Sequence, residues 1–189
     1  MKFEIVQTDF PGLFLMHVPT YADHRGSLTK VFEVPFWQER GIDIGGIKES
    51  YISVSHKYVF RGLHFQVERP QGKVIFPISG KLLDIAVDMR KGSPTYGKVH
   101  STEIEPYRTL IYVPRGFAHG ILALEDNTVY VAYQTEAYMT GSEGGVHWEY
   151  VREYLPVDGE ELILSDRDKS LPRFEDIESP FTYNPENLY

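Results

Sequence analysis

The stretch from Val59 to Lys73 reads VFRGLHFQVERPQGK and carries the clearest local signals in the sequence. Its first half is rich in apolar residues that favour a strand. Its second half contains a proline and a glycine that favour a turn, and Val74 to Ile78 (VIFPI) favours another strand. This order brings His64 and Lys73 close together in space. A titratable imidazole and a cation beside one pocket suit an anionic ligand that undergoes proton transfer. The alternative is an ordinary buried histidine with a lysine on the surface.

An Arg-Gly pair lies just before this histidine. In a regular strand Gly62 and His64 share one face, and Arg61 lies on the other. Arg61 and His64 serve one pocket only if Gly62 carries a β-bulge, which is a common role for a glycine in a strand. A pocket that uses both side chains therefore requires a bulge at Gly62.

Short apolar runs separated by turn residues extend outward on both sides of this stretch. Pro35 to Arg40 is expected to form one helical turn, and Gly41 to Gly46 a loop. About ten short strands with no long helical period predict an all-β fold, an antiparallel sandwich or barrel whose mouth is a common ligand site. Besides the two strands above, strands are predicted at Lys2–Gln7, Leu13–Val18, Ser27–Val34, Ile47–Ser55, Lys81–Met89, His100–Glu105, Thr109–Val113 and Val129–Thr135.

Alternation within two of these strands separates their faces. Between Lys81 and Met89 the apolar residues alternate with Asp84 and Asp88, so that the two acids face solvent or a polar pocket. Tyr133 shares a face with Val129, where a tyrosine is most often part of the core. Pro114 to Leu124 (PRGFAHGILAL) begins with a tight turn, and Gly120 after His119 allows a backbone to approach a ligand closely.

Length and composition restrict the class of protein. The 189 residues suit one domain with a full core, in which about 12–140 form the strand core and about 147–189 wrap around it as short helical elements. The net charge of −8 argues against sequence-independent binding of nucleic acid. The sequence contains no cysteine, and we find no signal peptide and no apolar run of membrane-spanning length, which together fit a cytosolic protein without membrane attachment.

Seven short motifs between about Gly12 and Pro172 resemble the dTDP-4-dehydrorhamnose 3,5-epimerase family and follow the order that the family has. Together they form a specific set, although each alone is weak. They are Asp23-His24-Arg25-Gly26, Phe60–Gln66 (FRGLHFQ), Gln71-Gly72-Lys73, Asp84–Arg90 (DIAVDMR), Ser93-Pro94-Thr95, Pro114–Gly120 (PRGFAHG) and Leu164–Asp168 (LSDRD).

The resemblance implies a cupin-like jelly roll, a homodimer, no metal and no organic cofactor. It also implies a nucleotide-linked 4-keto-6-deoxyhexose as substrate. Carbons next to its ketone lose a proton if the enolate is stabilised, and reprotonation from the opposite face inverts the centre. The expected activity is that of an isomerase, a nucleotide-sugar 3,5-epimerase of deoxysugar biosynthesis.

By position, the resemblance implies that His64 is the general base and that Asp168 orients it. Lys73 is the cation beside the developing enolate oxygen, and Tyr133 is the acid on the opposite ring face. The resemblance also allows Arg25 to contribute to the substrate site of the other subunit of the dimer. Contacts to the diphosphate, nucleotide or sugar are implied for Arg25, Arg61, His119, Tyr138, Glu143 and Arg167.

The sequence departs from the family at contact positions. Glu49 and Tyr51 stand where the family has a Gln-x-Asn nucleotide contact, and they are retained as candidate substrate contacts. Leu28 and Lys30 replace an aromatic residue and an acid. The distance from Tyr133 to the next candidate, Tyr138, is one residue shorter than is usual. The carrier (dTDP, CDP or GDP) and the inversion of one carbon or two remain open.

Two other classes of function remain as alternatives. A metal-dependent cupin enzyme needs two or three histidines and a carboxylate, for which His64, Glu68 and His119 are the candidates. A non-catalytic sugar-binding cupin needs no base, and the combination of a histidine, a lysine, a tyrosine and an aspartate argues against it.

Overall fold

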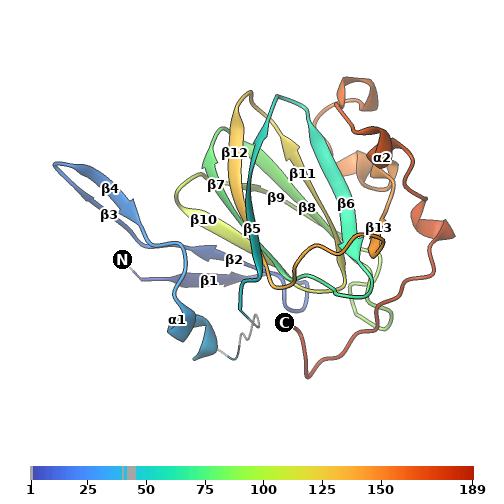
Figure 1. The fold of residues 1–189 in the computed structure, drawn as a ribbon, viewed down its shortest axis with the longest axis horizontal. Coiled ribbons are helices and arrows are strands. Elements are labelled where there is room, and N and C mark those ends of the chain that lie inside the picture. The colour runs from blue at the N-terminus through green and yellow to red at the C-terminus, as the bar shows by residue number, and fades with distance from the viewer. Residues whose placement is uncertain (1, 40, 42–45) are drawn as a thin grey trace.

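The computed structural model describes residues 2–39, 41 and 46–189. Within these residues most of the regular structure is strand, and the strands run through the chain to residue 145 (Figure 1). In chain order the strands are β1 (Glu4–Gln7), β2 (Phe14–His17), β3 (Thr20–Asp23), β4 (Gly26–Thr29), β5 (Glu49–Ser55), β6 (Phe60–Gln66), β7 (Lys73–Ser79), β8 (Leu82–Asp88), β9 (Val99–Ile104), β10 (Thr109–Val113), β11 (Phe117–Ala123), β12 (Thr128–Gln134) and β13 (Glu143–Gly145).

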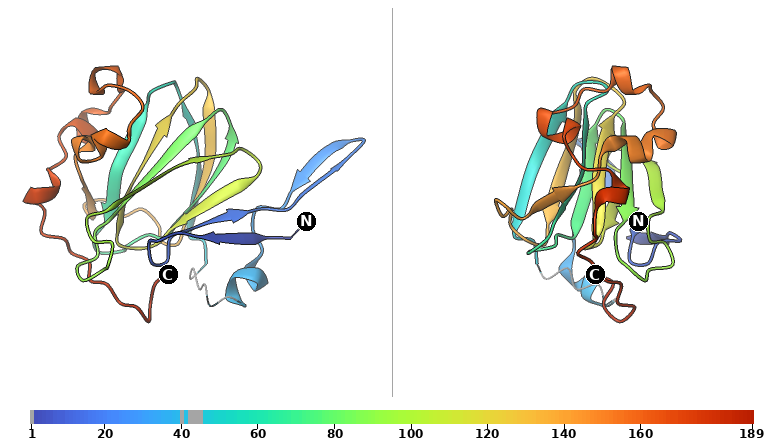
Figure 2. Two further views of the ribbon diagram at one scale, coloured as in Figure 1. Left: turned by 180° about the vertical axis from the view of Figure 1, so that it is seen from behind. Right: turned by 90° about the vertical axis from the view of Figure 1, so that its right-hand side faces the viewer.

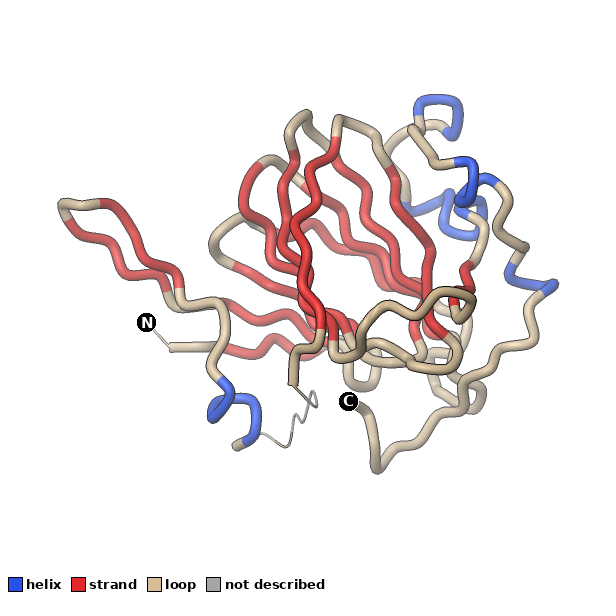
Figure 3. The backbone as a smooth tube through the Cα atoms, in the orientation of Figure 1, coloured by secondary structure: helices blue, strands red, loops and turns tan. Residues whose placement is uncertain are grey.

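Helical elements are short, and most of them follow the last strand (Figure 3). No helix in the described part of the chain is both long and apolar enough to span a membrane. The α-helices are α1 (Val34–Gln38) and α2 (Asp166–Lys169), and the 3₁₀ helices are η1 (Trp148–Tyr154), η2 (Gly159–Glu161) and η3 (Phe174–Asp176).

Two antiparallel sheets form the body of the molecule. One has six strands in the order β1-β2-β10-β7-β12-β5, and the other has five in the order β13-β6-β11-β8-β9. The right panel of Figure 2 shows the sheets as two facing layers behind the C-terminal segment, which lies toward the viewer. The prediction of an all-β antiparallel sandwich with short C-terminal helical elements is confirmed.

Strand alternation builds three apolar layers. Between the sheets, Ile75, Ile111, Tyr130 and Ala132 belong to one cluster. A second cluster covers the outer face of the six-stranded sheet and includes the buried Trp37 of α1. The third lies on the outer face of the five-stranded sheet. There, odd-numbered residues of β8 meet apolar residues of the segment that follows β13, among them Val151, Leu162 and Phe181.

One predicted strand is shorter in the structure, β11 was not predicted, and most of one predicted loop lies outside the described residues. The strand predicted at Ser27–Val34 is shortened to β4, which pairs with β3 in a separate hairpin that projects from the sandwich (Figure 1). The turn signals of Pro114 and Gly116 obscured β11, which crosses the five-stranded sheet between β6 and β8. The predicted helical turn is α1, but Arg40 and residues 42–45 of the predicted loop lie outside the described residues.

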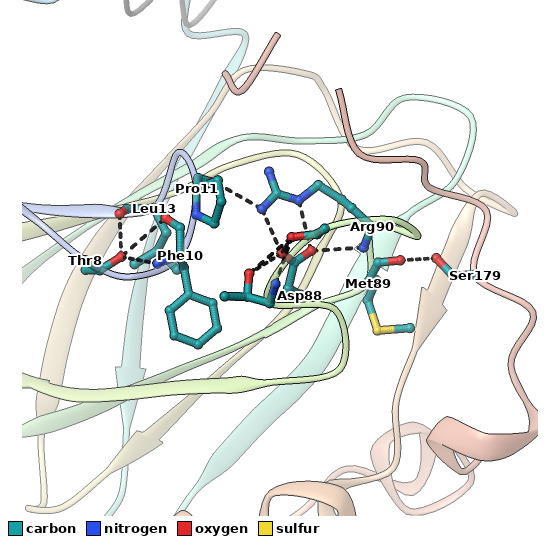
Figure 4. Close-up of polar contacts among 10 residues, drawn as sticks. Thr8, Phe10, Pro11, Leu13, Asp88, Met89, Arg90 and Ser179 are labelled. Carbon is teal, nitrogen blue, oxygen red and sulfur yellow. Dashed lines mark hydrogen bonds and ion pairs between the residues drawn. The ribbon is translucent and has the colours of Figure 1, made fainter. Parts of the chain in front are cut away.

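A buried ion pair ties three parts of the chain together at one end of the sandwich (Figure 4). Arg90 donates through its backbone and its guanidinium to the carboxylate of Asp88 and through Nη2 to the carbonyl of Pro11. Hydroxyls of Ser93 and Thr95 donate to the same carboxylate. The Ser179 hydroxyl donates to the Met89 carbonyl, so the C-terminal segment is attached beside the ion pair.

Candidate active site

A cavity of about 800 Å³ opens between the two sheets. Strands β5, β7 and β12 form one wall, β6 and β11 form the other, and the segment around α2 closes one side. Titratable side chains gather there from positions far apart in the sequence. The polar residues that line it include Arg61, His64, Lys73, His119, Tyr130 and Asp168.

The bulge that Arg61 and His64 require is present at Gly62. His64 pairs with His119 and Arg61 pairs with Ile121, so that two residues of β6 stand opposite one residue of β11. Gly62 has φ +136°, and a Cβ atom there would lie 2.5 Å from the Cα of Gly120. Only glycine fits so close to a neighbouring backbone. The bulge directs Arg61 and His64 to the same cavity, and the conditional prediction is confirmed.

The imidazole of His64 makes a close polar contact with Asp168. His64 Nε2 lies 2.6 Å from Asp168 Oδ1. Ser165 begins α2, and its hydroxyl accepts a hydrogen bond from the Asp168 backbone at 3.1 Å. This cap fixes the helical turn that carries the carboxylate. Burial alone raises the pKa of Asp168. The hydrogen bond and charge of His64 and the Gly62 amide outweigh burial and lower that pKa, so the carboxylate stays ionised at neutral pH.

The tautomer of His64 follows from this pairing. An ionised carboxylate accepts hydrogen bonds, so Nε2 carries the proton that is donated to Asp168. Nδ1 then holds the free lone pair, and it is the nitrogen available to take a proton from a bound molecule. An imidazole held in one orientation by a carboxylate is a common arrangement for a general base.

Lys73 is the first residue of β7, and its side chain extends toward β6, the strand that carries His64. Its ammonium donates to the carbonyl of His64 at 3.3 Å and is almost fully buried. Burial lowers the pKa of Lys73 to about 8, although the charge of Asp84 opposes this shift. At neutral pH the ammonium is therefore mostly charged, and it can stabilise negative charge that develops on a ligand.

A second histidine and aspartate form a separate pair on the same wall. Nε2 of His119 lies 2.8 Å from Oδ2 of Asp84, and both side chains are buried. Within the described part of the chain, the other carboxylate oxygen of Asp84 has no hydrogen-bond partner. Asp84 was predicted to face solvent or a polar pocket, but it is fully buried and reaches the cavity only through His119, which lines it. Because His119 pairs with Asp84, it does not compete with His64 for Asp168.

A smaller recess of about 160 Å³ continues the cavity and shares Tyr51, His64, Lys73 and Arg167 with it. Tyr138 donates its hydroxyl hydrogen to the carboxylate of Glu143, which lies 3.7 Å from Arg167. The backbone amide of Tyr138 donates to Glu49. The structure therefore brings the predicted contact residues Glu49, Tyr51, Tyr138, Glu143 and Arg167 together beside His64.

Two predicted site residues lie elsewhere. Tyr133 is on the outer face of the six-stranded sheet, where it packs against the cluster that contains Val74 and Phe76. The strand period explains this correction, because Tyr130 and Ala132 occupy the inner face of β12. Arg25 is at the turn of the β3–β4 hairpin, exposed and paired with Asp23 at 2.6 Å. Neither Tyr133 nor Arg25 lines the cavity.

Metal ligands are not grouped in this part of the molecule. Among the described residues, no three histidine, cysteine, aspartate or glutamate side chains lie together in a way that could hold a metal ion. His64 and His119 are each engaged by a different aspartate. The arrangement gives the metal-dependent alternative no support.

Comparison with known proteins assigns the family. The family model described as dTDP-4-dehydrorhamnose 3,5-epimerase matches residues 7–176. The chain belongs to this epimerase family. A relative named dTDP-4-dehydrorhamnose 3,5-epimerase, from Methanothermobacter thermautotrophicus, is 34% identical over 173 residues that cover 89% of this chain and 93% of the relative. Membership in the family confirms the predictions of an isomerase and of a cupin-like epimerase fold.

Solved structures of the epimerase family superimpose on most of the chain. An epimerase from Legionella pneumophila in complex with dTDP-4-keto-L-rhamnose has a TM-score of 0.87 at 29% identity and covers 97% of this chain and 100% of its own. A 3′-monoepimerase from Streptomyces bikiniensis in complex with dTDP-quinovose has a TM-score of 0.78 at 28% identity and covers 88% and 85%. The family fold therefore hosts both kinds of epimerase.

Sequence reasoning missed two residues of the candidate site. Asp84 was recognised as polar, but its pairing with His119 depends on β11, which was not predicted. Tyr130 lines the cavity. The predicted Tyr133 lies three positions after it on the same strand and does not. The alternation of buried and partly buried residues along β12 separates the two tyrosines, but which face is the inner one becomes visible only when both sheets are placed.

Proposed function

We propose that the protein is an epimerase that acts on a 4-keto-6-deoxyhexose carried by a nucleoside diphosphate, with dTDP as the first candidate carrier. It inverts the carbon on one side of the ketone or on both sides, as a step of deoxysugar biosynthesis. The names of its relatives support a dTDP-linked substrate. The homodimer implied by the resemblance stays a prediction, and so does the action of Arg25 across it.

The observation that carries this proposal is the contact between His64 Nε2 and Asp168 Oδ1, 2.6 Å long, on the wall of the large cavity. It leaves Nδ1 of His64 free to remove the proton next to the ketone. The C–H electron pair then moves into the enolate. Lys73 supports the negative charge on the enolate oxygen from its buried position beside His64.

Binding of the diphosphate is assigned to guanidinium groups at the cavity. Arg61 lines it and donates through Nε to Ser55 at 3.1 Å, and Arg167 lies where the cavity meets the recess. Arginine suits phosphate oxygens because its planar group offers several parallel donors. Glu49 and Tyr51 are the proposed contacts to the rest of the nucleotide or to the sugar.

The test is proton exchange in deuterated water. The purified protein is incubated with the 4-keto-6-deoxy sugar on dTDP, CDP and GDP, and NMR follows label at the two carbons that flank the ketone. Exchange at both carbons, with inverted products, indicates a 3,5-epimerase, and exchange at one carbon indicates a mono-epimerase. The carrier that supports exchange identifies the nucleotide.

Variants connect this exchange to the assigned residues. His64→Ala and Asp168→Asn are expected to slow turnover by about 100-fold or more, because each disables the base, and to leave nucleotide binding nearly unchanged. Loss of binding with normal turnover would contradict the roles given to both residues. No exchange with any of the three carriers would reject the epimerase proposal and favour a binding protein.

A further inference from the structure

Two tyrosines occupy neighbouring positions on the cavity side of β5 and β12. Tyr51 stands opposite Ala132 in the strand pairing, and Tyr130 stands opposite Ser53. The two rings therefore lie diagonally across the strand pair, with centroids 6.5 Å apart and planes at 66°. Both rings line the large cavity together with His64.

The two rings differ in exposure to solvent. Tyr130 is 3% exposed and belongs to the apolar cluster between the sheets, whereas Tyr51 is 41% exposed. Tyr51 also lines the smaller recess, where Gln134 and Glu49 are its neighbours. The pair thus extends from the interior of the cavity to its solvent-facing side.

Tyr130 lies across the cavity from the base. His64 belongs to the five-stranded sheet and Tyr130 to the six-stranded sheet, and the cavity separates the two sheets. A sugar ring bound between them presents one face to each sheet. His119 lies beside His64 on the neighbouring strand of the same sheet, so it does not face the opposite side of the ring.

Charge and burial suit Tyr130 to the role of an acid. Burial raises the pKa of Tyr130, while the hydroxyls of Ser53 and Tyr51 and the charge of Arg61 oppose that shift. The phenol therefore keeps its proton at neutral pH, and the nearby guanidinium stabilises the anion that remains when the proton leaves. Burial also raises the pKa of Tyr51, which remains protonated as well.

We propose that Tyr130 donates the proton that inverts the substrate carbon, on the ring face opposite His64, and that Tyr51 passes a proton from solvent back to Tyr130. This inference rests on the proposed function. The O–H bond of Tyr130 breaks and a C–H bond forms, while the enolate electrons restore the ketone. The tyrosinate takes a proton from Tyr51, which takes one from water, and His64 releases its own proton to water. No electron is transferred to or from another molecule.

Three single-atom deletions test the relay. Tyr130→Phe, Tyr51→Phe and Tyr133→Phe each remove one hydroxyl and keep the ring, and Tyr133→Phe is the matched control on the outer face of the same sheet. Each variant is assayed in deuterated water with the carrier on which the wild type is active. NMR records exchange without inversion separately from inversion.

Tyr130→Phe is expected to keep the exchange that depends on His64 and to lose inversion by about 100-fold or more. Tyr51→Phe is expected to slow inversion by roughly 10-fold, and added small buffer acids restore part of the rate because they replace the missing donor. A purely structural role of Tyr51 would not respond to buffer. Tyr133→Phe is expected to match the wild type in both measurements.

Other outcomes overturn the relay in distinguishable ways. Inversion at the wild-type rate in Tyr130→Phe, or loss of exchange together with inversion, would remove the role of donor from Tyr130 and leave the proposed function standing. Loss of inversion in Tyr133→Phe would do the same. If the wild type exchanges no label with any carrier, the proposed function fails and the relay fails with it.

Discussion

Lys73 shows how one buried residue sets the conditions under which the site works. Its ammonium is almost completely shielded from solvent and donates to a backbone carbonyl at 3.3 Å. Burial lowers its pKa to about 8, so that the charge which supports the enolate is present at neutral pH and lost in mild base. The same burial makes the charged form costly to the folded protein.

The rate is therefore expected to fall as the pH rises through about 8, because the neutral amine stabilises the enolate less. Lys73→Arg keeps a charge far above this pH, so its residual activity should lack this alkaline decline. Profiles of kcat/KM against pH for both proteins provide the measurement. An unchanged decline near pH 8 in the variant would show that another group is responsible.

The same residue illustrates what the sequence could predict at this scale. His64, Lys73 and Asp168 were assigned from their motifs, and the structure places all three at one cavity. Tyr133 was assigned by position, but its strand turns it away from the cavity. A motif fixes a residue type at a spacing, whereas the face on which a strand residue lies depends on the register of the whole sheet.

Among the elements, the contact between β6 and β11 depends on two glycines that face each other. The bulge at Gly62 brings its Cα hydrogens against the backbone of Gly120, where any larger residue would collide. This close approach sets the positions of Arg61 and His64 on one side and of His119 on the other. One glycine thus aligns three polar side chains of the cavity.

Gly62→Ala is expected to destabilise the protein by about 2–4 kcal/mol and to reduce turnover. The added Cβ would lie 2.5 Å from the Gly120 Cα, and the φ of +136° disfavours alanine. Denaturant unfolding and the exchange assay measure the two effects. Gly92→Ala is the control, since its φ is +86° but nothing lies within 4 Å of the added Cβ, and it should cost roughly 1 kcal/mol. Equal stability of the two variants would argue that the backbone contact is unimportant.

Strands with strong alternation were predicted with nearly correct bounds, as β8 shows, which was expected at Lys81–Met89 and spans Leu82–Asp88. The failure at β11 has a physical cause. Pro114 and Gly116 signal a tight turn, and Gly120 was interpreted as a place for close approach of a ligand, whereas it makes a close contact with the backbone of β6. Likewise, the strand predicted at Ser27–Val34 is shortened to β4, which pairs only with β3. In both cases local propensity was overridden by partners that are distant in the sequence.

Across the whole molecule, the Asp88–Arg90 pair holds the β1–β2 loop, the end of β8 and the C-terminal segment in one place. Burial alone raises the pKa of Asp88, but hydrogen bonds from Arg90 and Ser93 outweigh it and lower that pKa below its ordinary value. The folded protein therefore binds this proton less readily than the unfolded chain does. The resulting stabilisation is present above about pH 4 and is lost as the pH falls through the lowered pKa.

Asp88→Asn is expected to lower the free energy of unfolding by about 3–5 kcal/mol at neutral pH, because it leaves the buried Arg90 without its counter-charge. Its stability should also decline less steeply in acid than that of the wild type. Glu105→Gln, which breaks an exposed ion pair with Arg108, is the control and should change the stability by less than about 1 kcal/mol. Denaturant titrations from pH 3 to 7 measure both, and a loss under 1 kcal/mol for Asp88→Asn would contradict the role assigned to the pair.

The carboxylate that orients His64 stands 104 residues further along the chain. Because polypeptides are made from the N-terminus, every strand of the two sheets is synthesised before residue 168. A nascent chain at that stage has the base but lacks the side chain that sets its tautomer. Under the proposed function, the base therefore gains its orienting group only after the segment around Asp168 has been made and has packed against the sandwich.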